Sequence, residues 1–274
     1  MTMKHNLGYH IARFNVMIDM SKNVFFLSLI ILISSSFVGC ISNESNSNSI
    51  DLEVEFSKTN GTIIKSFNEG ELISTENVIL NFDFSKTKSS YDLTSFGIET
   101  FDREYLINSD DSSEISIEFS NHGFYHLNAF AIDENDNIEN ISILVRIELT
   151  THWVESNTNN PEPLKIEPIP NNNAIYPEMI EVFSKVENPS IISDFGGGGQ
   201  SVEFTWQIID RIEDVCQKKS SQVEDGESDE WETIHFNTYE DHELKITYDD
   251  GQDNINVEHY VSIIYPAEET LPNI

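Results

Sequence analysis

Basic residues are scarce in this chain: Lys and Arg number 15 against 48 Asp and Glu, which gives a net charge of −33 over 274 residues. Affinity for nucleic acid comes mainly from Lys and Arg that neutralise phosphates, so a DNA- or RNA-binding role is excluded. An anionic bilayer also repels such a chain, unless an inserted or covalent anchor holds it. Cysteine is scarcer still, with 2 residues. A disulfide-rich scaffold and a zinc cluster of several thiolates are therefore excluded.

Long apolar runs are also missing, with one short exception near the N-terminus. Residues 24–38 (VFFLSLIILISSSFV) carry no charge, follow Lys22 and precede Gly39-Cys40. A membrane-spanning helix needs about 20 apolar residues, so this shorter run is typical of a signal peptide. The chain continues as a polar tether over 40–49 (CISNESNSNS). We expect residues 1–39 to form the signal peptide, with Met20 as an alternative start of translation.

The string Phe37-Val38-Gly39-Cys40 resembles the lipobox of prokaryotic lipoproteins. The resemblance implies that Cys40 carries a lipid and becomes the N-terminus of an exported protein, anchored at the outer face of the cell membrane or the cell envelope. The alternative is an uncleaved N-terminal anchor in which Cys40 has no role. Both interpretations place the rest of the chain outside the cytoplasm.

The chain matches itself without gaps over residues 115–147 at an offset of 117 residues. A match of this kind predicts a tandem duplication. Large apolar residues that recur at matching positions should face the core of each copy. They are Phe119, Leu127 and Ile147 in the first copy and Phe236, Leu244 and Ile264 in the second, and Trp206 joins them in the strand predicted at 201–209.

Apolar residues alternate with polar ones in both copies, which is the pattern of strands with one buried face. Several short strands in about 100 residues, without intervening helices, predict an antiparallel sandwich. Residues 178–186 fit a strand or one face of a helix, and we predict a strand because everything around them is β. The sequence thus predicts an all-β protein with two tandem β-sandwiches at 50–150 and 175–268, a Pro- and Asn-rich linker at 151–174, and a tail at 269–274.

The segment Gly123-Phe124-Tyr125, the alternating strand that it begins and Asp133 in an Asx-rich turn resemble the C-terminal half of polycystic kidney disease (PKD) domains and related immunoglobulin-like domains of surface proteins. The second copy keeps the aspartate but has Glu240-Asp241-His242 in place of Gly-Phe-Tyr. The resemblance implies an immunoglobulin-like, PKD-like sandwich for each copy.

Asx-rich segments follow matching strands in the two copies, at 133–137 (DENDN) and 249–254 (DDGQDN). Such segments suit hairpin turns, while their oxygen atoms are also the ligands that Ca²⁺ prefers. Neither is an EF-hand loop, because Ile138 stands where glycine is needed. We predict plain turns and no cofactor, with a weak Ca²⁺ site as the alternative. Its ligands would be Asp133, Asn135, Asp136, Asp249, Asp250 and Asp253.

Other reactive side chains lack the local partners that chemistry needs. Cys216 has no nearby base or oxyanion hole in the sequence, so we expect a structural or incidental thiol, with an intermolecular disulfide as the alternative. The histidines after residue 40 form no His-x-His or HExxH pattern. We expect hydrogen-bonded strand or loop histidines, with a zinc or copper site as the alternative. No catalytic residue is therefore assigned.

These observations predict a non-enzymatic, lipid-anchored cell-envelope protein. It would act as a binding, adhesion or assembly module, with the membrane as its anchor and a surface protein or a glycan as its partner. Two alternatives stay open: a solute- or metal-binding lipoprotein, and an accessory subunit of an envelope enzyme.

Overall fold

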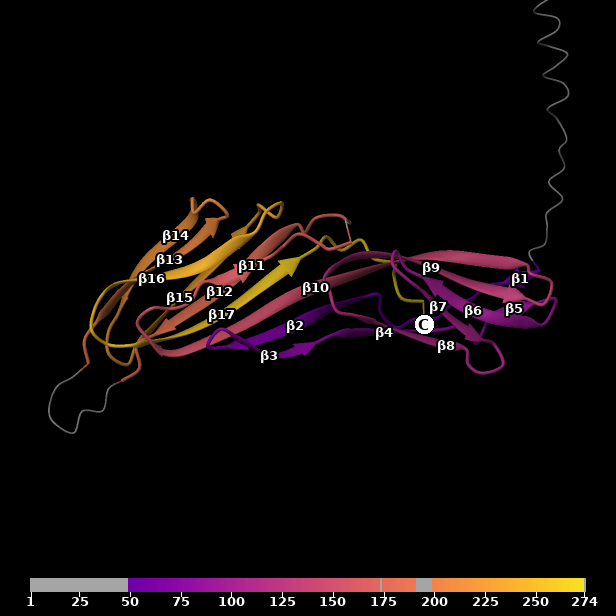
Figure 1. The fold of residues 1–274 in the computed structure, drawn as a ribbon, viewed down its shortest axis with the longest axis horizontal. Helices are drawn as coiled ribbons and strands as arrows, with labels where there is room; N and C mark the ends of the chain where they lie inside the picture. The colour runs from indigo at the N-terminus through magenta and orange to yellow at the C-terminus, as the bar shows by residue number, and fades with distance from the viewer. Residues whose placement is uncertain (1–48, 173, 191–198, 274) are drawn as a thin grey trace, which may run out of the picture. The chain divides into compact units, whose positions relative to one another are not determined.

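The computed structural model describes residues 49–172, 174–190 and 199–273, and Ser49–Ile274 forms one compact unit. The described residues fold into β-strands and contain no helix (Figure 1). Along strands such as β8 (Glu114–Phe119) and β17 (Ile255–Ile264), every second side chain is buried, because successive side chains of a strand point to opposite faces of its sheet. The prediction of an all-β protein is confirmed. The predicted signal peptide and Cys40 lie outside the described residues.

The first half of the described chain forms two antiparallel sheets around one core. One sheet pairs β4 (Val78–Asp83) with β8 (Glu114–Phe119). The other contains β7 (Glu104–Asn108), β6 (Leu93–Glu99), β9 (Gly123–Asp133) and β10 (Ile138–Thr158), paired in that order. A short pair, β1 (Ile50–Asp51) with β5 (Lys88–Ser89), completes this half.

The second half also forms two antiparallel sheets. One pairs β15 (Ser228–His235), β12 (Met179–Glu187) and β17 (Ile255–Ile264) in that order. The other has the order β11 (Leu164–Ile166), β16 (His242–Asp250), β13 (Val202–Asp210) and β14 (Val215–Val223). The strand predicted over 178–186 is confirmed, because β12 pairs with both β15 and β17 and buries every second side chain.

Strand β10 is shared by both halves. Its first part pairs with β9, and its continuation from Leu149 to Thr158 pairs with β17. On β10, residues 146–154 also pair in parallel with β2 (Asn60–Asn68), which pairs in turn with β3 (Glu71–Glu76). The segment expected as a linker over 151–174 therefore begins inside β10 and contains β11.

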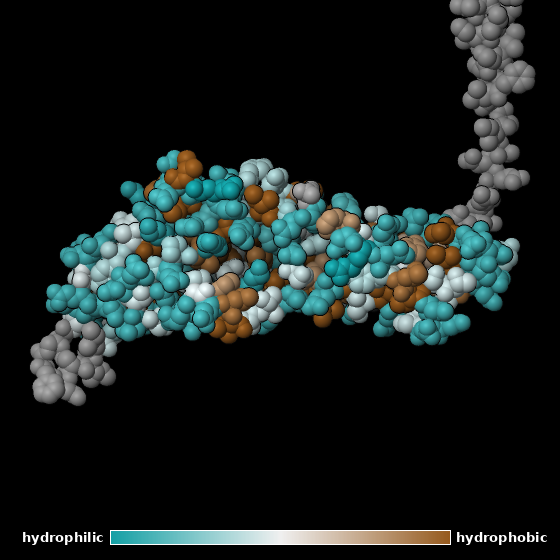
Figure 2. Space-filling model, viewed as in Figure 1, coloured by the Kyte–Doolittle hydropathy of each residue, from teal (hydrophilic) through white to brown (hydrophobic). Residues whose placement is uncertain are grey.

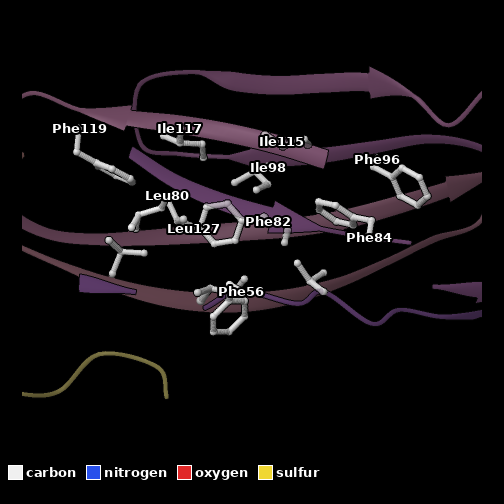
Figure 3. Packing of buried hydrophobic residues seen from close by; sticks show 14 of the residues in the cluster. Phe56, Leu80, Phe82, Phe84, Phe96, Ile98, Ile115, Ile117, Phe119 and Leu127 are labelled. Carbon is white, nitrogen blue, oxygen red and sulfur yellow. The ribbon is translucent and has the colours of Figure 1, made fainter. Parts of the chain in front are cut away.

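Two hydrophobic cores lie on the buried faces of these sheets. In the first core, aromatic rings from β4, β6 and the adjoining loops meet aliphatic side chains of β8 and β9 (Figure 3). Phe119, Leu127 and Ile147 lie in this core, whereas Trp206 and Leu244 lie in the second core. These five residues face inward as the period of two in the sequence predicts.

The other two predicted core residues do not face inward. Phe236 is 69% exposed just after the end of β15, and Ile264 is half-buried on the opposite face of β17 from Ile263. In β15 the buried residues are Trp231 and His235, so His235 rather than Phe236 matches Phe119. The true offset here is 116 residues, and a shift of one residue turns every side chain of a strand to the other face. The core assignment of Phe236 is wrong for this reason, and that of Ile264 is wrong because β17 pairs with β12 and buries Val261 and Ile263 instead.

The two halves share most of their strand pairing. The pairs β4–β8, β6–β7 and β6–β9 correspond to β12–β15, β13–β14 and β13–β16. They differ at the last strand, because β10 pairs with β9 whereas β17 joins the sheet of β12. Residues 133–137 therefore form the predicted hairpin turn, whereas 249–254 connect two different sheets. A hairpin at the second position is a wrong prediction.

The C-terminal segment after β17 packs back on the first half. Arg146 donates two hydrogen bonds to the Glu269 carboxylate, each 2.8 Å long, and Asn60 donates a third at 2.6 Å. Asn273 donates to the Val54 carbonyl oxygen at 2.7 Å. The Arg146 guanidinium holds the pKa of Glu269 at about 2, although partial burial opposes this shift. The tail is thus part of the folded unit.

Candidate functional site

A groove of about 430 Å³ lies between the two cores, on the face of the sheet formed by β2, β10 and β17. Its volume is within the range of small-molecule sites. The floor consists of Ile63, Leu149, Val261 and Ile263. The segments 120–122 and 162–171 form the walls. Five segments of the chain therefore meet here, namely 63–70, 120–122, 149–153, 162–171 and 261–263.

Aromatic rings form one end of the groove. Phe67 and Trp153 stack with their ring centroids 5.6 Å apart and an interplanar angle of 29°. Trp153 is 5% exposed, and its indole Nε1 is buried without a hydrogen-bond partner among the described residues. A buried donor without a partner costs about 1–3 kcal/mol. A ligand that accepts this hydrogen bond would remove the cost.

Charged groups of both signs line the walls of the groove. Lys65 and Lys165 supply donors, and Glu162 and Glu167 supply acceptors. Within the described part of the chain, the Lys65 ammonium makes no ion pair or hydrogen bond. In a chain of net charge −33, an ammonium group left open in a groove is available to a ligand.

His122 fixes the contact between the two walls. Its Nδ1 lies 2.8 Å from the Tyr265 hydroxyl, and its Nε2 lies 3.3 Å from the Glu167 carbonyl oxygen. Since the carbonyl only accepts, Nε2 carries the proton and Nδ1 accepts from Tyr265. Burial lowers the pKa of His122 to about 4, and the charge of Lys65 adds to this effect. His122 is therefore neutral at pH 7 and serves as a structural link.

The outer face of the β17 sheet carries a second, flatter patch. His152 stacks on Tyr260 at 4.3 Å with an interplanar angle of 9°, and Phe183 lies 6.1 Å from Tyr260 between ring centroids. Ile234 is 44% exposed beside them. Hydrophobic patches of this kind are scattered over a mainly hydrophilic surface (Figure 2). In the patch around Tyr260, the rings already pack on one another, and the patch is open to solvent. It is therefore the weaker ligand site.

The Asx turns that sequence analysis named differ in how their oxygens are used. Asp133 is buried and accepts hydrogen bonds from the backbone N–H groups of Asn135 and Asn137 and from the Asn137 side chain, at 2.9–3.1 Å. Burial raises its pKa, but these hydrogen bonds outweigh burial and hold the pKa below the ordinary value. Asp133 anchors its own turn, and Asp136 takes a positive φ of 59° there.

In the second turn, the carboxylates point to different partners. Asp249 accepts from the Thr205 hydroxyl at 2.7 Å, Asp250 accepts from the Gly251 N–H at 2.9 Å, and Asp253 is buried against the Gln200 N–H. The Ca²⁺ alternative stays a prediction, and the six proposed ligands are divided between two turns that lie in different halves.

Sequence analysis missed the groove, and it also missed a cluster of three side chains. Cys216, His235 and His242 lie together where the two sheets of the second half of the described chain meet. His122, His152, His242 and His259 are hydrogen-bonded as expected. In contrast, His235 Nε2 and the second nitrogen of His242, Nδ1, are buried without partners in the described residues. No short motif could reveal this cluster, because it depends on how edge strands of two sheets meet.

Among the described residues, no helix is long and apolar enough to cross a membrane.

Comparisons with protein families and with curated proteins find no match. Among solved structures, carbohydrate-binding modules of the β-sandwich superfamily match with 12% identity and a TM-score of 0.30, over 79% of this chain and 97% of theirs. A two-domain protein of unknown function from Bacteroides fragilis matches with 8% identity and a TM-score of 0.24, over 78% and 95%. The protein SGBP-B from the Bacteroides ovatus mixed-linkage glucan utilization locus, solved with a heptasaccharide, matches with 10% identity and a TM-score of 0.20, over 75% and 52%.

Proposed function

We propose that this protein is a non-enzymatic binding module, exported and held at the cell envelope by a lipid on Cys40, which takes a carbohydrate segment in the groove between its two cores. The single observation that carries the proposal is the groove itself. It combines a stacked aromatic pair, an indole N–H without a hydrogen-bond partner, and the Lys65 ammonium, which pairs with no described residue.

The lining fits a ligand with many hydroxyl groups. One face of a pyranose ring presents C–H groups, which pack on aromatic rings, and its edges carry hydroxyls that donate and accept hydrogen bonds. Phe67, which is half-buried and stacks on Trp153, supplies the ring surface. Lys65 and Trp153 Nε1 supply donors, and Glu162 supplies acceptors. A purely anionic ligand would be repelled by the carboxylates, and a purely apolar one would leave the charged groups without partners.

The groove offers binding groups rather than a reacting pair. The imidazole in its lining, His122, uses both nitrogens for structural hydrogen bonds and has a pKa of about 4. A general base for work near neutral pH needs a higher pKa and a free nitrogen. This supports a binding role without turnover.

Replacing Lys65 by methionine should weaken carbohydrate binding by about 10–100-fold, because a hydrogen bond from a charged donor contributes about 1.5–3 kcal/mol. Replacing Trp153 by phenylalanine keeps the packing and removes the N–H, so the loss should be smaller, about 2–10-fold. The measurement is calorimetric titration of the full chain with soluble gluco-, xylo-, manno- and chito-oligosaccharides. Lys218→Met, on exposed β14 outside the groove, is the matched control and should bind as wild type.

A different pattern would contradict the groove. If Tyr260→Ala, on the outer patch, abolished binding while Lys65→Met left it unchanged, the ligand would lie on the other face of the sheet. If wild type bound no member of the panel, the carbohydrate proposal would fail.

Replacing Cys40 by serine should abolish incorporation of labelled fatty acid in the native host and prevent normal processing. The proposal of a lipid anchor rests on the uncharged run at 24–38 followed by Gly39-Cys40. A single acyl chain binds a membrane only marginally, so two chains or a comparable lipid are needed. Intact-mass analysis of wild type checks this directly. An unmodified Cys40 with residues 20–39 still attached would contradict the anchor.

A further inference from the structure

The edges of the two sheets of the second half meet at β14 and β15. These strands are the outermost in their sheets, and side chains rather than backbone hydrogen bonds join them. Gln217 donates to the Ile234 carbonyl oxygen at 2.9 Å and accepts from the Thr233 hydroxyl at 2.6 Å. Further along, Lys219 pairs with Asp229 at 2.9 Å. We call this line of contacts the edge seam.

Three potential metal ligands lie at one end of the edge seam. They are Cys216 on β14, His235 at the end of β15 and His242 at the start of β16. The Cys216 Sγ and one ring nitrogen of each histidine all lie within 4.8 Å of one another. The two imidazole rings meet at 79° with their centroids 4.5 Å apart. Both histidines are more than nine-tenths buried, and Cys216 is exposed.

The hydrogen bonds of His242 show which nitrogen is free. Its Nε2 lies 2.8 Å from the Asn237 carbonyl oxygen, which only accepts, so Nε2 carries the proton. Nδ1 therefore carries a lone pair, and it is buried without a partner among the described residues. This is the arrangement of a metal-bound histidine, whose second nitrogen donates to a carbonyl group and fixes the ring.

His235 presents a second nitrogen of the same kind. Its Nε2 is also buried without a partner in the described part of the chain. Two unpartnered buried nitrogens at one place are rare, because nearly all buried polar atoms have a partner.

The surroundings of Cys216 favour a cation. The carboxylates of Asp210, Glu240 and Asp214 act electrostatically on its thiol. The same carboxylates attract a divalent ion, whose charge lowers the pKa of a coordinated thiol. Cys216 is exposed, and its thiol donates one weak hydrogen bond of 3.8 Å to the Asp214 carbonyl oxygen, which a bond to a metal ion would replace.

We propose that Cys216, His235 and His242 bind one Zn²⁺ ion, or another borderline transition-metal ion with the same preference for sulfur and nitrogen, and that this ion ties the two sheets together at the edge seam. On binding, the thiol loses one proton to solvent and its sulfur lone pair forms the bond to the metal. Three protein ligands leave the fourth tetrahedral position to water. The site lies apart from the groove residues, so it stands independently of the carbohydrate proposal.

Cobalt spectroscopy of the full, tag-free chain tests this site. One equivalent of Co²⁺ should give a sulfur-to-cobalt charge-transfer band together with tetrahedral d–d bands, and Zn²⁺ should displace both. Cys216→Ser should abolish the charge-transfer band and weaken Zn²⁺ binding by at least tenfold, since loss of a second-shell partner alone costs about 10–100-fold. His235→Gln should weaken binding similarly. His126→Gln, exposed on β9, is the control and should bind as wild type.

Thermal melting supplies a second readout. Zn²⁺ should raise the melting temperature of wild type and leave that of Cys216→Ser unchanged, whereas Ca²⁺ at equal ionic strength should not reproduce the rise. Because Cys216 is exposed, the serine variant should fold and its result is decisive. A charge-transfer band that survives Cys216→Ser, or wild type that binds no stoichiometric Co²⁺ or Zn²⁺, would overturn the proposal.

Discussion

Replacing Trp206 by alanine should lower the free energy of unfolding by about 3–5 kcal/mol, the cost of deleting a buried large aromatic side chain. Trp206 is fully buried, with Phe204 edge-on at 4.7 Å and Trp231 at 6.2 Å between ring centroids. Its Nε1 donates to the Ser184 hydroxyl at 2.6 Å. Alanine would leave both a cavity and a buried hydroxyl with one partner fewer.

Phe236 provides a matched contrast for this experiment. Sequence periodicity placed it in the same core, but it is 69% exposed. Phe236→Ala should change the unfolding free energy by no more than about 0.5 kcal/mol, as exposed substitutions do. Urea denaturation of both variants measures the two effects. Equal destabilisation by Trp206→Ala and Phe236→Ala would contradict the register assigned to β15.

Acidification should destabilise the protein strongly between about pH 6.5 and pH 4. His259 is fully buried, and its Nδ1 lies 2.8 Å from the Ser184 hydroxyl. The same hydroxyl accepts from Trp206, and His259 is neutral because burial disfavours the charged ring. Burial lowers the pKa of His259 to about 3, and that of His122 to about 4.

The sign follows from the two states. Each histidine has a lower pKa folded than unfolded, where it is near 6.5, so the unfolded chain binds more protons in this range. The contribution of these two histidines to stability is fully present above about pH 6.5. It falls as the pH falls, by up to about 1.4 kcal/mol per pH unit for each histidine. Below about pH 4.5, protonation of Glu269 adds a further loss, because its folded pKa is about 2.

Urea denaturation measured from pH 7.5 to 4 tests this prediction. The quantity compared is the slope of the free energy of unfolding against pH, not its absolute value. His259→Asn lowers stability at every pH. Its unfolding should take up about one proton fewer, so its free energy of unfolding should depend less steeply on pH. His126→Asn, exposed on β9, should leave the slope as in wild type. A His259→Asn variant with the wild-type slope would show that His259 is not buried as a neutral ring.

The sequence predicted the fold class because strand periodicity is a local property. Alternation around Leu127, Trp206 and Leu244 indicates which face of each strand is buried, and these residues lie in the cores. The ungapped repeat could not reveal that β15 is shifted by one residue. It also could not show that β17 joins the sheet of β12, because sheet membership depends on contacts between distant strands.

The candidate sites depend even more on distant contacts. The groove needs β2, β10 and the segment 162–171 to meet, and the cysteine–histidine cluster needs the edges of two sheets to meet. The residue types gave one partial signal: His235 and His242 were considered as zinc or copper ligands, but Cys216 was considered separately. Burial of a nitrogen without a partner is visible only in the structure.

The indole N–H signal of Trp153 tests the central claim, that the groove holds the ligand, most directly. The chain has 3 tryptophans, so a ¹⁵N-correlation spectrum resolves three indole signals at most, and Trp153→Phe identifies the one in the groove. Titration with the best-bound oligosaccharide should shift the Trp153 signal in a saturable way and leave those of Trp206 and Trp231 in place. A ligand that binds with equal affinity but leaves the Trp153 signal unmoved would contradict the account.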